Sequence, residues 1–184
     1  MIAGPSGVGK GSIVKRLLGE SNSGHGSGTV LSVSATTRTP RPNEVQGRDY
    51  VFLDRDGFQK MAEDDGLLEW AEVFGNLYGT PRAFVEQERA AGRDVILEID
   101  VQGAKLVRER VPDAVLILLE PPSLEELARR LRGRGTESEE KIALRLKEAG
   151  RELSQRDLFD HVVVNDDLQR ASSQVAAIID ASRS

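Results

Sequence analysis

The sequence predicts an α/β fold in which helices flank a mainly parallel central sheet. Two observations carry this prediction. Short apolar runs that look like strands alternate with amphipathic runs that look like helices, which is typical of strand–helix–strand units. A glycine-rich turn, GPSGVGKGS at residues 4–12, lies between the first apolar run and the first amphipathic run, as in folds that bind a phosphate at the start of a helix.

The same runs give the order of the elements. The expected strands lie at 1–3, 29–34, 94–100, 114–120 and 161–165, and the expected helices at about 10–18, 82–91, 103–110, 123 onward, 138–153 and 168 onward. Ser123 is followed by Glu126 at the spacing of a capping box. The stretch 21–28 is expected to be a surface loop by its composition. Only three residues precede Gly4, whereas a strand in this position is normally central, so a trimmed or mis-started amino terminus is expected.

Residues 35–80 interrupt the alternation. The stretch is rich in arginine and contains only short alternating runs, within RDYVFL at 48–53 and LLEWAEVF at 67–74. This pattern predicts a small inserted subdomain with short strands rather than another strand–helix unit.

Composition and charge argue against several classes of function. The net charge of −5 is unlike that of a general nucleic-acid-binding protein, which is normally basic. The absence of cysteine excludes disulfides, zinc–thiolate sites and thiol catalysis. The longest apolar run, at 114–119, is far too short to cross a membrane, and no signal segment opens the chain. We therefore expect a cytoplasmic protein, a monomer or small homo-oligomer, without nucleic-acid or membrane partners.

The turn at 4–12 matches the phosphate-binding pattern G-x-x-x-x-G-K-[ST] except at its last position. In such a loop, successive backbone N–H groups point at a phosphate, and the following helix presents its positive end to it. Lys10 adds a cation at the β- and γ-phosphates. Gly11 stands where a hydroxyl normally reaches magnesium, and Ser12 is the candidate to supply that hydroxyl instead, directly or through water. The loop is expected to bind a nucleotide triphosphate, against the alternative of a simple glycine turn.

A second group of candidate phosphate ligands lies at residues 34–52. Arg38 and Arg41 are three residues apart, and Tyr50 follows soon after. Prolines at 40 and 42 keep this segment out of a helix. Two guanidinium groups and a phenol on such a segment suit a phosphate monoester, while a solvated charged loop is the alternative.

With these pieces in this order, the chain resembles the guanylate kinases from Gly4 to about Leu168. The matching stretches are GPSGVGKG at the loop, SVSATTRTPRPNEVQGRDYVF at 32–52, EW at 69–70, YGT at 78–80, ILEIDVQG at 96–103, RGRGTE at 132–137 and VNDDL at 164–168. The resemblance implies transfer of the γ-phosphoryl group of ATP to GMP, with Mg²⁺ as cofactor and dGMP as a further candidate substrate. It also implies a P-loop kinase fold, with core segments at 1–34, 81–126 and 156–184, a GMP-binding subdomain at 35–80 and a helical lid at 127–155.

The roles of individual residues follow from the resemblance. The implied catalytic residues are Lys10, Arg38, Asp100, Arg134 and Arg145. The implied ATP-binding residues are Gly4, Ser6, Gly7, Val8, Gly9, Lys10, Gly11, Ser12, Arg134 and Asn165, the last on the adenine side. The implied GMP-binding residues are Arg38, Arg41, Tyr50 and Tyr78 at the phosphate, Ser34, Glu69 and Thr80 at the base, and Glu44, Glu98 and Asp100. Ser12 and Asp100 are implied to hold magnesium, partly through water. Glu98 stands where the family often has aspartate.

The chemistry of guanine supports the role of Glu69 independently. Guanine presents N1–H and an exocyclic amine side by side, and one carboxylate can accept both hydrogen bonds, whereas adenine offers a bare acceptor at N1. A buried Glu69 would therefore favour guanine and leave an unpaired charge against adenine. No catalytic base is required, because the attacking phosphate oxygen, with a second pKa of about 6, is already ionised near neutral pH.

Two features receive structural interpretations. Glu125–Arg129 and Glu126–Arg130 have the i,i+4 spacing of exposed ion pairs on a helix. Trp70 is expected in the core, because side chains alternate along a strand and it would face away from its neighbour Glu69.

Two other functions stay open as alternatives. A guanylate-kinase-like scaffold domain binds protein partners without catalysis, but such domains tend to lose the loop lysine and the phosphate-reading arginines, which are present here. A related kinase acting on a sugar phosphate is the second alternative, although Ser34, Glu69 and Thr80 would then have no base to read.

Overall fold

A computed structural model describes residues 1–21, 28–133 and 138–183, and the expected loop at 21–28 lies mostly outside these residues. The central sheet contains the parallel strands β1 (Ile2–Ala3), β2 (Thr29–Leu31), β7 (Asp94–Ile96), β8 (Ile117–Glu120) and β9 (His161–Val164). Ladders join β2 to β7, β1 to β8 and β8 to β9, and a parallel bridge between Ile2 and Glu98 connects the two groups. The strand order is therefore β2-β7-β1-β8-β9, which confirms the predicted parallel sheet.

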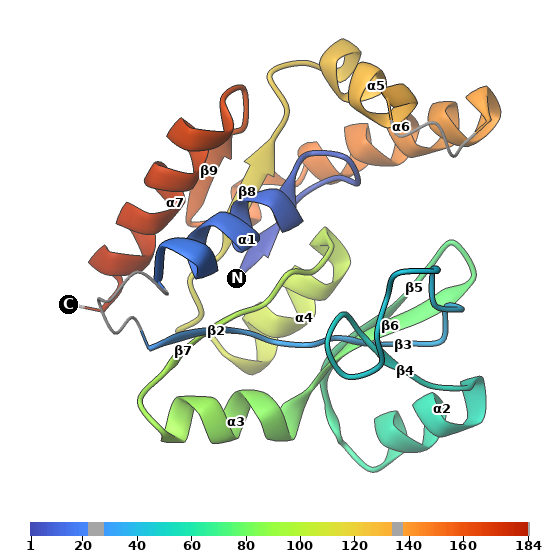
Figure 1. Cartoon of the computed structure of the whole chain (residues 1–184), viewed down its shortest axis with the longest axis vertical. Coiled ribbons are helices and arrows are strands. Elements are labelled where there is room, and N and C mark those ends of the chain that lie inside the picture. Colours follow the sequence, from blue (N-terminus) through green and yellow to red (C-terminus); the bar gives the residue numbers. More distant parts are fainter. Residues whose placement is uncertain (22–27, 134–137, 184) are drawn as a thin grey trace.

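Helices cover both faces of this sheet (Figure 1). Helices α1 (Lys10–Ser21) and α7 (Leu168–Ala181) share one hydrophobic cluster with Ile117 and Leu119 of β8. Helices α3 (Arg82–Ala90) and α4 (Val101–Arg110) share the opposite cluster with Leu118 of β8 and the preceding Leu116. Because both faces are buried, the strands read as continuous apolar runs rather than as alternating ones.

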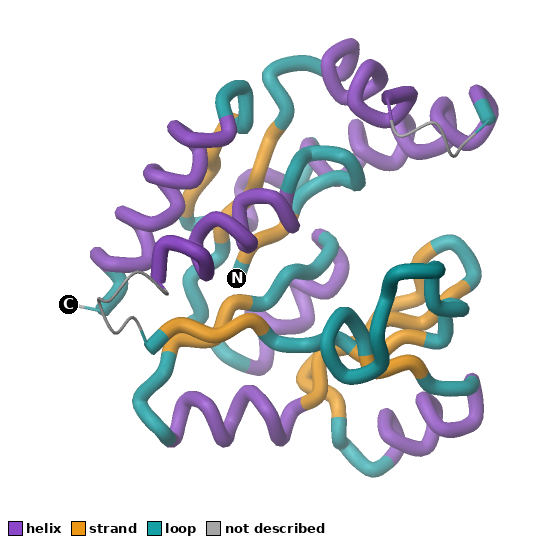
Figure 2. Tube along the Cα trace, viewed as in Figure 1, coloured by secondary structure: helices purple, strands orange, loops and turns teal. Residues whose placement is uncertain are grey.

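A second, smaller sheet forms within residues 35–81. Its strands are β3 (Ala35–Thr36), β4 (Val51–Phe52), β5 (Leu67–Val73) and β6 (Asn76–Pro81), in the order β4-β3-β6-β5. The β3–β4 pair is parallel and the other pairs are antiparallel, so the sheet is mixed. Helix α2 (Arg55–Glu63) packs Phe58 into a separate hydrophobic cluster with Ala35, Leu67 and Leu77. Figure 2 shows that the chain between β3 and β4 is loop, and prolines 40 and 42 are consistent with the absence of a helix there.

Helices α5 (Leu124–Gly133) and α6 (Glu139–Leu153) form a pair with their own cluster of Leu127, Leu131, Ile142 and Ala149. A 3₁₀ turn, η1 (Arg156–Leu158), leads from α6 toward β9. The Ser123 hydroxyl accepts a hydrogen bond from the Glu126 N–H at 3.2 Å, as expected for a cap. The Glu126 carboxylate bonds instead to Arg129 and Arg130, at 2.7 and 2.8 Å. The predicted Glu126–Arg130 pair is therefore present, whereas Arg129 pairs with Glu126 three residues away.

Three expectations about the fold need correction. The strand expected at 29–34 ends at Leu31, and the next residues cross to the small sheet; the strand expected at 94–100 likewise ends at Ile96. Helix α2 and strand β6 were not predicted. Trp70 faces away from Glu69 as expected, but it is 44% exposed rather than part of the core. Its ring meets Phe58 of α2 edge-on at 6.3 Å, so the nine-residue helix covers it only partly.

No helix in the described part of the chain is long and apolar enough to cross a membrane.

Candidate active site

The phosphate loop joins the carboxyl end of β1, a central strand, to the first turn of α1. Strand β1 lies where the strand order reverses, and such a switch point is where open α/β sheets bind ligands. Gly7 and Gly9 have φ angles of +92° and +103°, a conformation that other residues rarely adopt. A Cβ at Gly7 would lie 2.8 Å from the Leu131 side chain, and one at Gly9 would lie 2.4 Å from the amide of Asn165. Both the backbone conformation and the neighbours therefore require glycine.

Residues from distant parts of the chain hold the outer side of this loop. The Asn165 side-chain amide, 5% exposed, donates to the Val8 carbonyl at 2.7 Å. Arg130 of α5 donates to the Asn165 carbonyl at 2.8 Å and to the Val8 carbonyl at 3.4 Å. Asn165 is thus buried against the loop, and its contact with the adenine side of ATP stays a prediction. Arg130 was expected only as an exposed ion-pair partner. Its position in the sequence between Leu127 and Leu131, whose side chains face Gly7, indicates that it lies on the side of α5 that contacts the loop.

The first turn of α1 faces Glu98, one of two carboxylates that follow β7. The Lys10 ammonium donates to the Gly4 carbonyl at 2.6 Å, so its side chain folds over the loop. Burial raises the pKa of Glu98, and the charge of Lys10 partly opposes that shift. A Cβ at Gly11 would lie 3.6 Å from the Glu98 carboxylate, which places Glu98 beside this turn. Asp100 caps α4, where its carboxylate accepts from the Gly103 N–H at 2.7 Å.

Ser12 is exposed in the same first turn of α1. Its hydroxyl and the carboxylates of Glu98 and Asp100 are hard oxygen donors of the kind that Mg²⁺ takes. Within the described residues, no group of three or more His, Cys, Asp or Glu side chains could hold a metal by itself. This donor set fits Mg²⁺, because that ion is usually held by one or two carboxylates together with water and substrate phosphates.

The arginines of the 34–52 segment are organised by one carboxylate. Glu44 accepts from the Arg38 guanidinium at 2.8 Å and from the Arg41 backbone N–H at 2.7 Å. The Arg38 hydrogen bond lowers the pKa of Glu44, so the pair is ionised. The Arg38 guanidinium lies 5.3 Å from the Tyr50 ring centre, and the Tyr50 ring meets Tyr78 edge-on at 6.2 Å. Contacts thus connect Arg38, Glu44, Tyr50 and Tyr78 into one group at the small sheet. The Arg41 side chain, in contrast, is 71% exposed.

Glu69 occupies a closed position between the small sheet and α4. It is 4% exposed, and the Thr80 hydroxyl on the paired strand donates to its carboxylate at 2.6 Å. A Cβ at Gly103 would lie 2.7 Å from the second carboxylate oxygen of Glu69, so the absence of a side chain there makes room for this group. Burial raises the pKa of Glu69 to about 7, and the Asp100 charge adds to the shift. Ser34 is half-buried directly before β3, and its carbonyl accepts from the Val51 N–H at 2.9 Å.

Arg145 connects α6 to the phosphate loop, because its guanidinium donates to the Ser6 hydroxyl at 2.7 Å. The other predicted arginine, Arg134, lies outside the described residues. The described site residues therefore form two groups, one at the loop with Arg145 and one on the small sheet. Glu98 and Asp100 follow β7 between the two groups, since Glu98 faces Lys10 while Asp100 influences Glu69.

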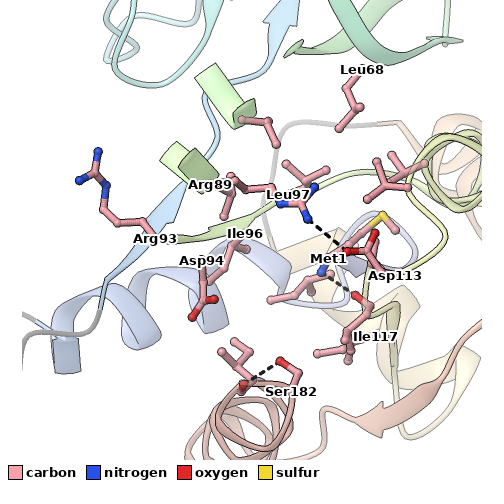
Figure 3. Close-up of a pocket in the computed structure, with 18 residues that line it drawn as sticks. Met1, Leu68, Arg89, Arg93, Asp94, Ile96, Leu97, Asp113, Ile117 and Ser182 are labelled. Atoms are coloured by element: carbon pink, nitrogen blue, oxygen red, sulfur yellow. Dashed lines mark hydrogen bonds and ion pairs between the residues drawn. The ribbon is translucent and has the colours of Figure 1, made fainter. Parts of the chain in front are cut away.

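A cavity of about 280 Å³ lies at the opposite end of the central sheet (Figure 3). Its lining includes Met1, Asp94 and Val115, which lie at or near the amino ends of β1, β7 and β8. The Met1 amine donates to the Val115 carbonyl at 2.8 Å, and burial lowers its pKa to about 6. Since ligands of open α/β sheets bind at the carboxyl ends of the strands, this cavity is not part of the candidate site.

Comparisons with known proteins agree with this geometry. The family model described as guanylate kinase matches residues 1–182. The guanylate kinase of Syntrophomonas wolfei is 49% identical over 183 residues, which cover 100% of this chain and 91% of that protein. The guanylate kinase of Parasynechococcus marenigrum is 54% identical over 171 residues, which cover 93% of this chain and 91% of that protein. A crystal structure of guanylate kinase from Anaplasma phagocytophilum matches with a TM-score of 0.79 at 35% identity, and the match covers 98% of this chain and 84% of that one. The chain belongs to the guanylate kinase family.

Proposed function

We propose that this protein transfers the γ-phosphoryl group of ATP to GMP, giving ADP and GDP. The observation that carries the proposal is the position of Glu69, a buried carboxylate held by Thr80 next to Asp100, on the side of the molecule where Glu98 faces the phosphate loop. A protein that only bound partners through this fold would not need a buried, desolvated carboxylate at that point. The substrate of a sugar-phosphate kinase would have no guanine to donate hydrogen bonds to the Glu69 carboxylate.

The chemistry requires positioning and charge neutralisation rather than a base. The GMP phosphate oxygen that attacks is already ionised near neutral pH. Lys10 in the loop, Arg145 from α6 and Arg38 on the small sheet carry the positive charge that two polyanionic substrates need in order to approach in line. Arg134 is proposed to add to this charge. The loop N–H groups and the positive end of α1 hold the ATP phosphates.

Glu69 selects the base. Its ionised form can accept the two adjacent N–H donors of guanine, while Thr80 holds one of its oxygens from the other strand. Adenine would place an acceptor against the same carboxylate and leave a buried charge without a partner. Burial raises the pKa of Glu69 to about 7 in the free protein, so both forms are present near neutral pH, and GMP is expected to bind the ionised form because only that form accepts both donors.

Magnesium is proposed as the cofactor, held by Asp100 and Ser12, with Glu98 close by and partly through water. The ion would neutralise phosphate charge during transfer. We further propose that residues 35–80 act as the GMP-binding part and 127–155 as a lid over a core formed by 1–34, 81–126 and 156–184. The separate hydrophobic clusters of the small sheet and of the α5–α6 pair support this division. Cytoplasmic location, a monomeric or small oligomeric state and acceptance of dGMP stay predictions.

A coupled assay of ADP release tests the function directly, with GMP, dGMP, AMP and ribose phosphates offered as acceptors at saturating ATP and magnesium. We expect rapid turnover with GMP and little with AMP. Folded protein that releases no ADP with any acceptor would indicate the scaffold alternative. Faster turnover with a ribose phosphate than with GMP would indicate the sugar-phosphate kinase.

A further inference from the structure

Phe74 is an unfavourable residue for the position that it occupies. Val73 pairs with Asn76, so Phe74 and Gly75 alone form the turn of the β5–β6 hairpin. Their φ angles are +50° and +79°, as in a type I′ turn, which favours Asn-Gly. A bulky aromatic residue with positive φ is a backbone outlier, and its side chain is also 52% exposed. Neither the turn nor burial explains a phenylalanine here, and such strain tends to persist where a residue has a functional contact.

The contact lies on another element. The Arg145 guanidinium of α6 lies over the Phe74 ring, 5.0 Å from its centre, within the range of a cation–π interaction. The same guanidinium donates to the Ser6 hydroxyl of the phosphate loop at 2.7 Å. In Figure 1 the β5–β6 hairpin extends toward the α5–α6 pair, which lies beside the loop. One side chain thus connects the tip of the small sheet, helix α6 and the phosphate loop.

We propose that Phe74 is a positioning residue that holds the Arg145 guanidinium at the phosphate loop and so couples the small sheet to that loop. This inference rests on the proposed function, because it concerns the arginine that meets the ATP phosphates. An arginine has many rotamers, and a ring on one face together with a hydroxyl at one edge restricts them before a phosphate arrives. Since Phe74 moves with the small sheet, a ligand that shifts that sheet also shifts the support of Arg145. By linkage, GMP and ATP then alter each other's affinity by the same factor.

One substitution at position 74 can improve the turn and at the same time remove the contact with Arg145, so it separates the two roles of this residue. Phe74→Asn supplies the residue that a type I′ turn prefers and removes the ring, so it should keep or raise the melting temperature while it impairs the enzyme. Phe74→Tyr keeps the ring and should restore activity. Leu144→Gln is the matched control, because Leu144 precedes Arg145, is 48% exposed, and is likewise apolar.

Two measurements test the coupling. In steady-state assays, Phe74→Asn should lower kcat/KM for ATP about two- to fivefold, the range of an exposed cation–π contact, while Phe74→Tyr and Leu144→Gln stay within about twofold of the wild type. In calorimetry, the factor by which GMP tightens a non-hydrolysable ATP analogue should fall in Phe74→Asn by a similar amount. Unchanged turnover and unchanged coupling in Phe74→Asn would overturn the proposal, as would equal impairment in Phe74→Tyr.

A thermal double-mutant cycle with Arg145→Lys needs no nucleotide and separates this inference from the proposed function. Lysine keeps the charge but loses the planar group that stacks on the ring. If the contact exists, the shifts in melting temperature of Phe74→Asn and Arg145→Lys will not add. Additive shifts would refute the contact even in a protein that phosphorylates GMP. A wild type without GMP turnover would refute the proposed function and leave the cycle interpretable.

Discussion

The phosphate loop and the arginine segment at 34–52 are proposed to bind the same chemical group, yet they are built in opposite ways. The loop offers backbone N–H groups, and Asn165, which follows β9, together with residues from α5 and α6 holds it in place. The arginine segment offers side chains, and a single carboxylate, Glu44, holds Arg38 and the backbone of Arg41.

This difference determines how each site can be damaged. A substitution cannot remove a backbone N–H, except to proline, so the loop is vulnerable at Lys10 and at its glycines. The small sheet carries its charge and its proposed base-reading group on side chains, which substitutions can replace. Single substitutions there should therefore change substrate affinity and selectivity while the fold persists.

The largest effect is expected from Lys10→Ala, which removes the cation of the loop. We expect kcat to fall at least about a hundredfold, as when one preorganised group at a transition state is deleted. Lys15→Ala, on the exposed side of the same helix, is the control and should have normal activity. Circular dichroism should show both variants folded. Near-normal turnover of a folded Lys10→Ala variant would mean that the loop does not cradle the transferring phosphate.

Glu69→Gln should have the next largest effect, and on selectivity as well as rate. The substitution keeps the size of the side chain but sets an N–H₂ donor against one of the two guanine donors. Hydrogen bonds to charged groups contribute about 1.5–3 kcal/mol, so kcat/KM for GMP should fall roughly ten- to a hundredfold. AMP turnover should fall much less or rise. Glu72→Gln, an exposed site on the same strand, serves as the control, and unchanged GMP turnover in folded Glu69→Gln would remove Glu69 from base recognition.

The pH dependence of GMP binding should report the same carboxylate. Burial raises the pKa of Glu69 from its ordinary 4.5 to about 7, so most of the free protein carries a protonated Glu69 at pH 6. GMP binding should therefore release a proton at pH 6, and affinity should rise about tenfold between pH 6 and 8. Calorimetry in two buffers of different ionisation enthalpy measures the proton count. The phosphate of GMP also titrates near pH 6, and Glu69→Gln measures its share; equal proton release in both proteins would contradict this reading.

The smallest effect on GMP use is expected from Glu44→Gln, which removes the ion pair that holds Arg38 but keeps both arginines. KM for GMP should rise about three- to tenfold, because partly exposed ion pairs contribute modestly, while KM for ATP measured at saturating GMP should not change. Asp49→Asn alters a carboxylate of the same segment that pairs with Arg48 instead, and should leave KM for GMP near normal. A parallel rise in KM for ATP at saturating GMP would contradict the assignment of Glu44 to the GMP site alone.

The same contrast explains what the sequence could predict of the site. The loop was recognisable because backbone sites need glycine and lysine at fixed spacing within nine residues. The hydrogen bond of Arg130 to the loop could not be predicted, because it depends on how α5 packs against a loop more than 120 residues away in the chain. Glu44 was assigned by resemblance to the GMP site, but its contacts with Arg38 and Arg41 come from the fold of the segment.

The fold was predictable where apolar runs were long and buried, and less so in the small sheet. Helix α2 was missed because its sequence, RDGFQKMAE, is polar and contains Gly57. Its signal was present: Asp54 caps the helix by accepting from the Gly57 N–H at 2.7 Å, and Phe58 lies at the start of an apolar stripe. Trp70 was placed in the core from strand alternation alone, and alternation gives the direction of a side chain but not whether anything covers it.

The surroundings of the Glu69 carboxylate have a consequence for the transfer of substrate specificity from one related enzyme to another. One oxygen is held by Thr80 from the small sheet, but the space for the other exists because α4, a core helix, has glycine at position 103. A chimera that joins residues 35–80 to the core of another protein would contain Glu69 and Thr80 but not Gly103, which makes room for the second carboxylate oxygen. If Glu69 reads the base as proposed, base preference depends on two segments of the chain, and α4 contributes to it only by the absence of a side chain at position 103.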